Sequence, residues 1–305
     1  MIPMKRLIVI VGATGSGKTD ASIALAAHFN APVISADSRQ IYRGIPIGTA
    51  QPSAEQLAAA EHHFIASHDL TENFSCGQFE VQALALLERL FAEHDTVIAV
   101  GGSGLYIKAL CDGMDDLPAV DETLRKTLNE RIRTEGIAPL LAELKERDPA
   151  YYECVDRDNP SRVLRAVEVC IQTGQPYSSL RTGEKRRRDF EIVKIGIEMD
   201  RAVLYERIDR RVDAMIAEGL EDEARKVWHL KHLNSLQTVG YRELFDYFDG
   251  ITDRQTAIEL IKRNSRRYAK RQMTWFRRDA EIHWLRPEQI PDFFNIQNRR
   301  HIIEH

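Results

Sequence analysis

Short apolar runs rich in β-branched residues recur along the chain, bounded by polar or glycine residues. Such runs are typical of strands that are buried on both faces of a parallel sheet. Helical periodicity fills the intervals between them, for example over 20–29 and 78–91, and this alternation predicts a doubly wound α/β sheet. The predicted strands are Leu7–Val11, Pro32–Ala36, Thr96–Val100, Ile192–Ile197 and, as a final addition, Ile282–Leu285.

The pattern changes between about Asp121 and Asp189, where charged helical segments follow one another without a convincing strand. We interpret this stretch as a helical insertion into the α/β core. The expected domains are therefore a core formed by 1–120 and 190–305 and an insertion formed by 121–189. The length of 305 residues fits this division, since it exceeds the usual size of one compact domain.

Charge and cysteine usage narrow the class of protein. A net charge of -4 argues against a surface that binds polyanions everywhere, so a nucleic-acid site must come from local clusters. Four cysteines without a CxxC pair indicate reduced thiols in a cytosolic protein. The basic start Met4-Lys5-Arg6 precedes too few apolar residues for a secretion signal, and no run reaches the ~18 residues of a membrane span. We expect a cytoplasmic protein with no membrane partner.

A phosphate-binding loop follows the first predicted strand and opens a predicted helix. Its residues match G-x-x-x-x-G-K-[ST] and are Gly12, Ala13, Thr14, Gly15, Ser16, Gly17, Lys18 and Thr19. Backbone N–H groups and the helix N-terminus attract phosphate, Lys18 adds a cation, and the Thr19 hydroxyl is offered to Mg²⁺. The context disfavours a plain glycine turn. The loop predicts a bound diphosphate or triphosphate but not the bond that breaks, because kinases and NTPases share it.

Polar groups follow two further strands at the same edge of the predicted sheet. Asp37 comes directly after Pro32–Ala36, at a carboxyl end, where open α/β sheets bind ligands. A turn or helix-cap residue is an equally good interpretation of Asp37 from its spacing alone. The turn Gly101–Gly104 follows Thr96–Val100 and carries one hydroxyl, on Ser103. Tight turns also need glycine for positive φ, so this turn alone leaves a structural role open.

A basic helix is predicted near the C-terminus. Eight Lys and Arg residues and no acid occur from Lys262 to Arg278, while Ile261, Tyr268 and Trp275 recur every seven positions as a buried stripe. A charge run is usually a solvated face, but an acid-free run on an acidic protein favours contact with RNA. The shorter patch Lys185–Arg188 is equally consistent with a solvated loop.

Five further motifs accompany the phosphate loop in a fixed order. They are DSRQIYRGIPIGTAQP (37–52), GGSGLYIKAL (101–110), SRVLRAVEV (161–169), VGYRE (239–243) and AKRQMTWFRR (269–278). From Leu7 to about Leu285 the chain resembles the bacterial tRNA isopentenyltransferase family, the tRNA dimethylallyltransferases. The resemblance implies a P-loop kinase-like core with a mobile helical insertion. It also implies Mg²⁺-dependent transfer of a dimethylallyl group from dimethylallyl diphosphate to the exocyclic N6 amine of the adenosine 3′-adjacent to the anticodon of tRNA.

The resemblance also assigns roles to residues. Asp37 would be the general base, Ser38, Arg39 and Gln40 would line the flipped adenine, and Ser103 would lie beside the reacting groups. Lys18 and either Arg207 or Arg211 would act on the departing diphosphate. The residues expected to contact tRNA elsewhere are Arg125, Ser161, Arg162, Val163, Leu164, Arg165, Gln237, Thr238, Val239, Gly240, Tyr241 and Arg242. Two positions depart from the family, since Ser103 is usually threonine and Gln237 is basic in several relatives.

Prenyl transfer to an adenine amine requires both a general base and cations. An adenine amine is a poor nucleophile, so a base must take its proton while cations stabilise charge on the diphosphate. A small-molecule kinase would share the loop and Asp37 but would not need the basic helix. A nucleotide-gated RNA-binding protein would use Asp37 only as a cap. The loop recognises phosphate, so ATP binding stays open. A monomer is expected.

Overall fold

The computed structural model describes residues 5–295. Met4 of the basic start and the outer ends of the expected core segments, 1–4 and 296–305, lie outside the described residues. The chain divides into a core unit, which runs up to Cys111 and resumes at Arg188, and an insertion unit, Asp112–Arg187. The expected borders were 121 and 189. The linker before 121 belongs to the insertion, because Arg165 donates to Pro118 O and Gln172 to Ala119 O.

The core unit contains a six-stranded sheet in the order β3-β2-β4-β1-β5-β6, and every neighbouring pair is parallel. The strands are β1 (Arg6–Val11), β2 (Val33–Ser35), β3 (His62–His63), β4 (Thr96–Gly101), β5 (Glu191–Ile197) and β6 (Ile282–Leu285). The five predicted strands are confirmed. Strand β3 was not predicted, since two histidines without an apolar run give no strand signal.

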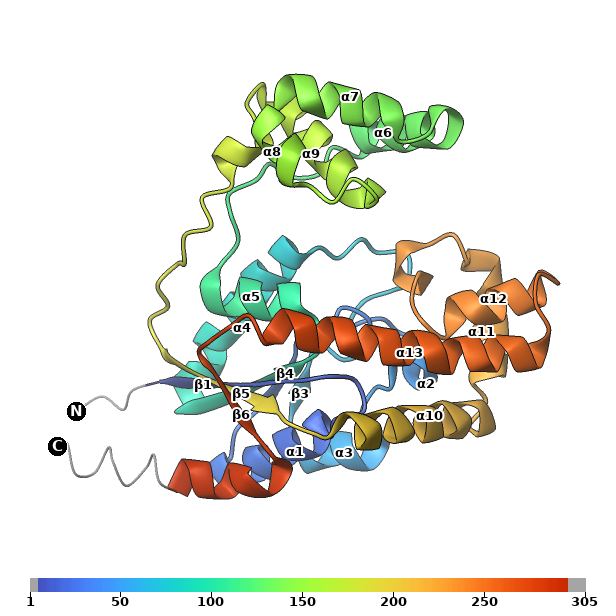
Figure 1. Cartoon of the computed structure of the whole chain (residues 1–305). Coiled ribbons are helices and arrows are strands. Elements are labelled where there is room, and N and C mark those ends of the chain that lie inside the picture. The colour runs from blue at the N-terminus through green and yellow to red at the C-terminus, as the bar shows by residue number, and fades with distance from the viewer. Residues whose placement is uncertain (1–4, 296–305) are drawn as a thin grey trace. The chain divides into compact units, whose positions relative to one another are not determined.

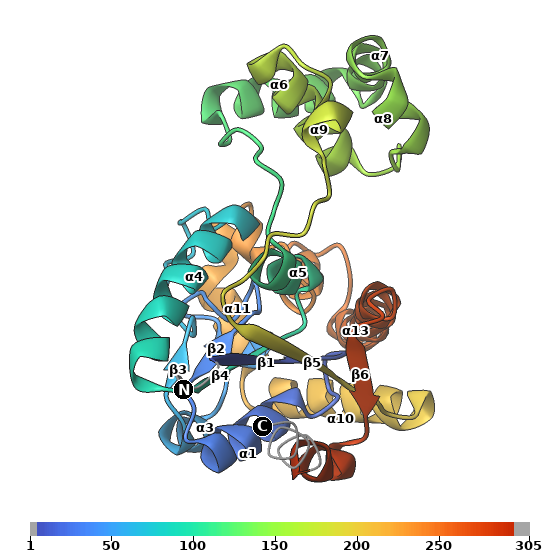
Figure 2. The same ribbon diagram turned by 90° about the vertical axis from the view of Figure 1, so that its left-hand side faces the viewer.

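Helices cover both faces of the sheet (Figures 1 and 2). One face carries α1 (Lys18–Phe29), α3 (Ala54–Ala59) and α10 (Arg201–Ala217), and the other carries α4 (Cys76–Glu93), α5 (Gly104–Asp112) and α13 (Arg254–Phe276). Alternate residues of β1 enter two separate clusters. Leu7 and Val9 pack with α4 and α5, whereas Ile8 and Ile10 pack with α1. A central strand with two covered faces needs apolar residues at every position, which explains its unbroken apolar run.

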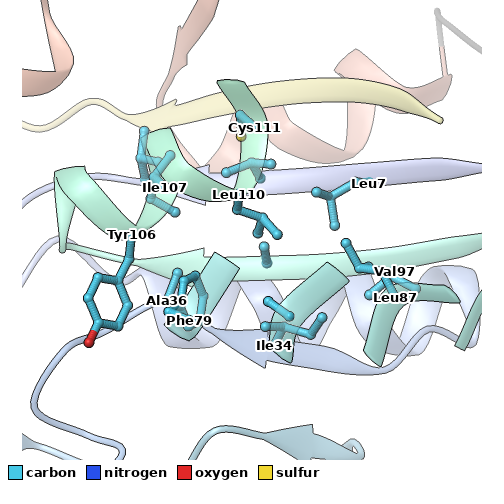
Figure 3. Packing of buried hydrophobic residues seen from close by; sticks show 14 of the residues in the cluster. Leu7, Ile34, Ala36, Phe79, Leu87, Val97, Tyr106, Ile107, Leu110 and Cys111 are labelled. Atoms are coloured by element: carbon cyan, nitrogen blue, oxygen red, sulfur yellow. The ribbon is translucent and has the colours of Figure 1, made fainter. Parts of the chain in front are cut away.

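The cluster under α4 and α5 fixes the turn after β4 (Figure 3). Tyr106, three residues beyond Ser103, stacks on Phe79 of α4 with ring centroids 4.4 Å apart. Ile107 and Leu110 of α5 are buried in the same cluster. Because the first turn of α5 is held by these side chains, the glycine-rich segment before it has a fixed position.

Smaller helices complete the core unit beyond the carboxyl ends of the strands. They are α2 (Pro46–Thr49), α11 (Leu220–Val227) and α12 (Tyr241–Phe248), with short 3-10 turns at Trp228–Leu230 and Asn234–Leu236. A further 3-10 turn, Pro287–Gln289, follows β6. Fully buried Tyr241 anchors this region, and its hydroxyl bonds Glu223. None of the helices within residues 5–295 is long and apolar enough to cross a membrane.

The insertion unit is helical, as the sequence pattern predicted. It contains α6 (Glu122–Glu135), α7 (Ala138–Arg147), α8 (Pro149–Cys154), α9 (Pro160–Thr173) and a 3-10 turn at Tyr177–Leu180. Leu128, Leu140 and Leu144 form the centre of its own apolar cluster. The unit therefore has a core of its own.

Candidate active site

The phosphate loop has the backbone that its glycines permit. Gly15 and Gly17 have φ of +80° and +90°, values that residues with a side chain rarely adopt. Helix α1 begins directly after Gly17, at Lys18. The ammonium of Lys18 folds back and donates to Ala13 O at 2.6 Å. Ser16 Oγ is buried without a hydrogen-bond partner in the part of the chain that is described. The loop and the first turn of α1 thus carry a buried cation, Lys18, and a buried hydroxyl, Ser16 Oγ, that has no partner among the described residues.

Burial changes the acidity of Lys18. Desolvation lowers its pKa to about 8, the Asp37 carboxylate opposes this shift, and the Arg211 guanidinium adds to it. Burial also lowers the pKa of Arg211, against the effect of Asp37. The two cations and the carboxylate are therefore close enough to sense one another, although they come from three separate elements.

A cavity of about 160 Å³ brings these groups together. Lys18 and Thr19 enter from α1, Asp37 from the end of β2, and Arg211 from α10. Its other polar lining residues are Thr14, Ser22, Ser35, Arg39, Gln40, Thr49, His62, Thr238, Ser265, Tyr268 and Gln272. The cavity lies where carboxyl ends of neighbouring parallel strands meet, which is the edge that the sequence indicated.

The two carboxylate oxygens of Asp37 have different surroundings. Its Oδ1 accepts N–H bonds from Arg39 at 2.9 Å and Gln40 at 3.4 Å, which is a turn-capping arrangement. No hydrogen bond reaches its other oxygen, Oδ2, from the residues that the structure describes. One carboxylate oxygen thus holds the local backbone while the second is available to accept a proton.

Ser103 is bonded to the Asp37 segment. Its Oγ accepts the N–H of Ser38 at 2.9 Å and donates to Ser38 Oγ at 3.2 Å. The glycines around it have ordinary negative φ, so positive φ is not the reason for them. They are required by close packing, because a Cβ on Gly102 or Gly104 would lie 2.2 or 2.3 Å from side chains of α13.

The two residues after Ser38 are held by the protein itself. Gln40 Nε2 donates to Thr49 O and Ala50 O, and its Oε1 accepts from Ser35 Oγ. Arg39 Nη1 donates to Asn234 O at 2.6 Å. Both side chains line the cavity. A nucleobase that entered would therefore meet side chains whose orientation is already fixed.

The structure distinguishes the two candidate arginines of α10, Arg207 and Arg211. Arg211 lines the cavity with Lys18 and Asp37 and is partly buried. Arg207 is exposed and lies on the outer side of the loop, where its Nη2 would be 3.7 Å from a Cβ on Gly17. Geometry therefore favours Arg211 as the arginine that faces the phosphate site.

Helix α13 turns its predicted stripe toward the site. Tyr268 lines the cavity, and burial raises the pKa of its hydroxyl to about 12, with the Asp37 carboxylate acting in the same direction. Gln272 is buried and bonds both the phosphate loop and the glycine turn. Sequence reasoning missed Gln272. A usable signal was its polar side chain within the spacing that places Ile261, Tyr268 and Trp275 on one helix face.

The basic charges of α13 are of two kinds. Lys262 pairs with Asp213 at 2.7 Å and Arg266 pairs with Asp209, both acids being on α10. Arg263, Arg267, Lys270 and Arg271 are exposed on the remaining surface. Only this second group has the exposure that an RNA-contacting face requires.

The expected tRNA-contacting residues from Gln237 to Arg242 have different environments. Thr238, Val239 and Gly240 line the cavity, and Gln237 and Arg242 are exposed. Tyr241 is fully buried in the core unit. Its side chain therefore supports this wall from behind.

In the insertion unit, the side chains of Val163 and Leu164 are buried in the apolar cluster, which leaves only their backbone for an RNA contact. The guanidinium groups of Arg125 and Arg165 bond Glu168, whose side chain is fully buried. Within the insertion unit, the exposed residues of the expected set are Ser161 and Arg162.

The donors at the loop suit magnesium. Within residues 5–295 no group of three or more His, Cys, Asp and Glu side chains is placed to hold a metal ion. An ion here would be held by the Thr19 hydroxyl together with phosphate oxygens and water. Mg²⁺ prefers such oxygen ligands and retains several waters, so the residues present fit it.

Known proteins resemble the chain over nearly its whole length. The family profile described as "IPP transferase" matches residues 40–279. The "tRNA dimethylallyltransferase 2" of Parabacteroides distasonis is 50% identical over 95% of this chain and 97% of its own length. The "tRNA dimethylallyltransferase 1" of Bacteroides thetaiotaomicron is 48% identical over 98% of each chain. The crystal structure of the full-length tRNA isopentenylpyrophosphate transferase of Bacillus halodurans covers 99% of this chain with 37% identity and a TM-score of 0.71. The chain therefore belongs to the IPP transferase family.

Proposed function

We propose that the protein transfers the dimethylallyl group of dimethylallyl diphosphate to the N6 amine of the adenosine 3′-adjacent to the anticodon in tRNA, releasing diphosphate. The observation that carries the proposal is one cavity with an anion cradle at Lys18 and a half-engaged carboxylate at Asp37. A prenyl donor and an amine acceptor need these two groups within one site. Family membership favours this activity over a small-molecule kinase.

Asp37 is the proposed general base. Oδ2 takes the N6 proton as the amine nitrogen forms its bond to the allylic carbon, and Oδ1 keeps the carboxylate oriented through its backbone N–H bonds. The adenine must leave its stack to reach this oxygen. The Ser38, Arg39, Gln40 and Ser103 segment is the proposed wall against which it lies.

Lys18 and Arg211 are the proposed partners of the leaving group. As the bond from the allylic carbon to oxygen breaks, its electron pair passes to the diphosphate, and fixed cations in a desolvated site stabilise that charge. A Mg²⁺ ion, when bound at Thr19, would supply further positive charge to the phosphate oxygens. Arg211, which lines the cavity, is assigned this role in preference to Arg207.

Contacts with tRNA are proposed at the exposed basic face of α13 and at Ser161 and Arg162 of α9. The protein is proposed to act as a monomer. The reaction is assigned to the cytoplasm, where its proposed tRNA substrate is found.

The test is a mass spectrum of an anticodon stem-loop RNA after incubation with the protein, Mg²⁺ and dimethylallyl diphosphate. The expected result is a gain of one five-carbon unit on the adenosine next to the anticodon. A stem-loop with guanosine at that position is the control. A parallel incubation with ATP examines the kinase alternative, and phosphate transfer without prenylation would overturn the proposal.

A further inference from the structure

Gln272 is a buried polar residue near the C-terminal end of the basic helix α13. Only 6% of the residue is exposed, and both ends of its side-chain amide are bonded to backbone groups from distant parts of the chain. Oε1 accepts the N–H of Thr14 at 2.8 Å, and Nε2 donates to Gly102 O at 3.0 Å. Neither bond connects residues near to each other in sequence, so the amide joins three elements at one point.

The contact with the glycine turn is tight. A Cβ on Gly102 would lie 2.2 Å from Gln272 Nε2, and one on Gly104 would lie 2.3 Å from the ring of Trp275. Helix α13 thus rests directly on the backbone of the β4–α5 turn. Buried amides are costly unless paired, so the two bonds fix which end of the Gln272 amide faces which loop.

The two loops joined by Gln272 carry opposite halves of the proposed reaction. Thr14 belongs to the phosphate loop, which would hold the donor. Gly102 precedes Ser103, whose hydroxyl bonds Ser38 next to Asp37. Gln272 therefore connects the donor side to the acceptor side through a single side chain.

We propose that Gln272 is a positioning residue, which sets the separation between the phosphate loop and the glycine turn and so the approach of the N6 amine to the allylic carbon. This inference rests on the proposed prenyl transfer. A misplacement of about 1 Å in such a site costs up to about 10²-fold in rate, whereas donor affinity depends mainly on the cradle itself.

The hydrogen-bond polarity of the amide offers a specific test through Gln272→Glu. An ionised carboxylate accepts from Thr14 N–H but presents a second acceptor to Gly102 O, and two acceptors repel. A protonated carboxyl group has the shape and polarity of the amide and restores both bonds. Burial and the hydrogen bond to the neutral form raise the pKa of such a carboxyl group. Activity of this variant should therefore recover as the pH falls.

The experiment measures single-turnover prenylation of the stem-loop RNA at saturating donor, with each variant normalised to the wild-type protein at every pH from 6 to 8. Gln272→Met should be slower by roughly 10- to 10²-fold at every pH, with a smaller change in donor affinity. Gln272→Glu should be equally slow at pH 8 and gain at least about fivefold at pH 6. Matched controls are Gln255→Met and Gln255→Glu, because Gln255 is an exposed glutamine of the same helix.

Thermal melts at both pH values establish that each protein is folded at the assay temperature. Normal rates in folded Gln272→Met, or a Gln272→Glu to wild-type ratio that stays flat with pH, would overturn the positioning role. If Gln272→Met does not fold, the pH ratio of Gln272→Glu decides alone, and failure of both to fold assigns Gln272 to stability and overturns the inference. A wild-type protein that transfers no prenyl group would instead reject the proposed function.

Discussion

Donor binding should be linked to protonation of Lys18. In the free protein, burial lowers the pKa of this ammonium to about 8, so part of the population is neutral in mildly alkaline solution. A bound diphosphate places negative charge beside Lys18 and favours the charged form, which raises the pKa. The protein must then take up a proton whenever the donor binds above the free-state pKa.

The size of the effect follows from the two pKa values. At pH 8.5 about three quarters of Lys18 is neutral in the free protein, and if the bound pKa returns to about 10.4, about 0.7 proton is taken up per donor. Donor affinity is fully present below about pH 7, is about half of that at pH 8, and falls further as the pH rises, approaching about tenfold per unit until the bound pKa is reached. Below about pH 7 there should be no uptake by this group.

Isothermal titration calorimetry measures the proton uptake directly. Dimethylallyl diphosphate is titrated into the protein at pH 8.5 in two buffers with different ionisation enthalpies. The hydroxyl of Tyr268 and the thiol of Cys76 do not interfere, because burial raises each pKa to about 12. Lys18→Arg is the control, since a guanidinium stays charged and should take up no proton. In Asp37→Asn the uptake should begin at lower pH, because Asp37 raises the Lys18 pKa. Equal heats in both buffers, or uptake unchanged in Lys18→Arg, would refute the linkage.

Three further predictions concern the same cavity and its surroundings. Asp37→Asn should slow single-turnover prenylation by ~10² to 10⁴-fold with a normal thermal melt, and a near-normal rate would leave Asp37 with only its turn-capping role. Arg211→Ala should lower the single-turnover rate by at least about tenfold more than Arg207→Ala, because only Arg211 lines the cavity, and equal effects would contradict the assignment. Arg267→Ala should reduce the salt slope of tRNA binding by ~0.7 to 0.9, as for one lost phosphate contact, whereas the ion-paired Arg266 should change it less when replaced by Ala.

The position of the site followed from sequence because strand order imposes it. Gly12 and Asp37 follow β1 and β2, and Gly101 is the last residue of β4. Because these strands are parallel neighbours, the three residues must lie at one edge of the sheet. The short strand β3 lacks an apolar pattern and was missed. The reason for glycine at Gly102 was also beyond prediction, since it depends on a side chain of α13 that is about 170 residues away in sequence.

The basic run from Lys262 to Arg278 correctly predicted a helix, but it did not show which of its charges are exposed and unpaired. The acid-free stretch of α13 has acidic partners, but they lie on α10, where Asp209 and Asp213 meet Arg266 and Lys262. A one-dimensional count of charges cannot detect a neighbour on another helix. Pairing of this kind neutralises part of the run and leaves the exposed arginines as the face with unbalanced charge.

A turn-capping role and a catalytic role of Asp37 do not exclude each other, because the two carboxylate oxygens can serve different roles. A base that must act on an incoming adenine needs a fixed orientation, and the N–H bonds from Arg39 and Gln40 to Oδ1 supply it. Those bonds hold the carboxylate within the cavity, and they leave Oδ2 open to the substrate side. The turn that made Asp37 look structural in the sequence is therefore compatible with its proposed role as general base, because it fixes the orientation of the carboxylate. Gln272 applies the same principle across a longer distance, since its amide orients two loops with backbone bonds and leaves the reacting groups to neighbouring residues.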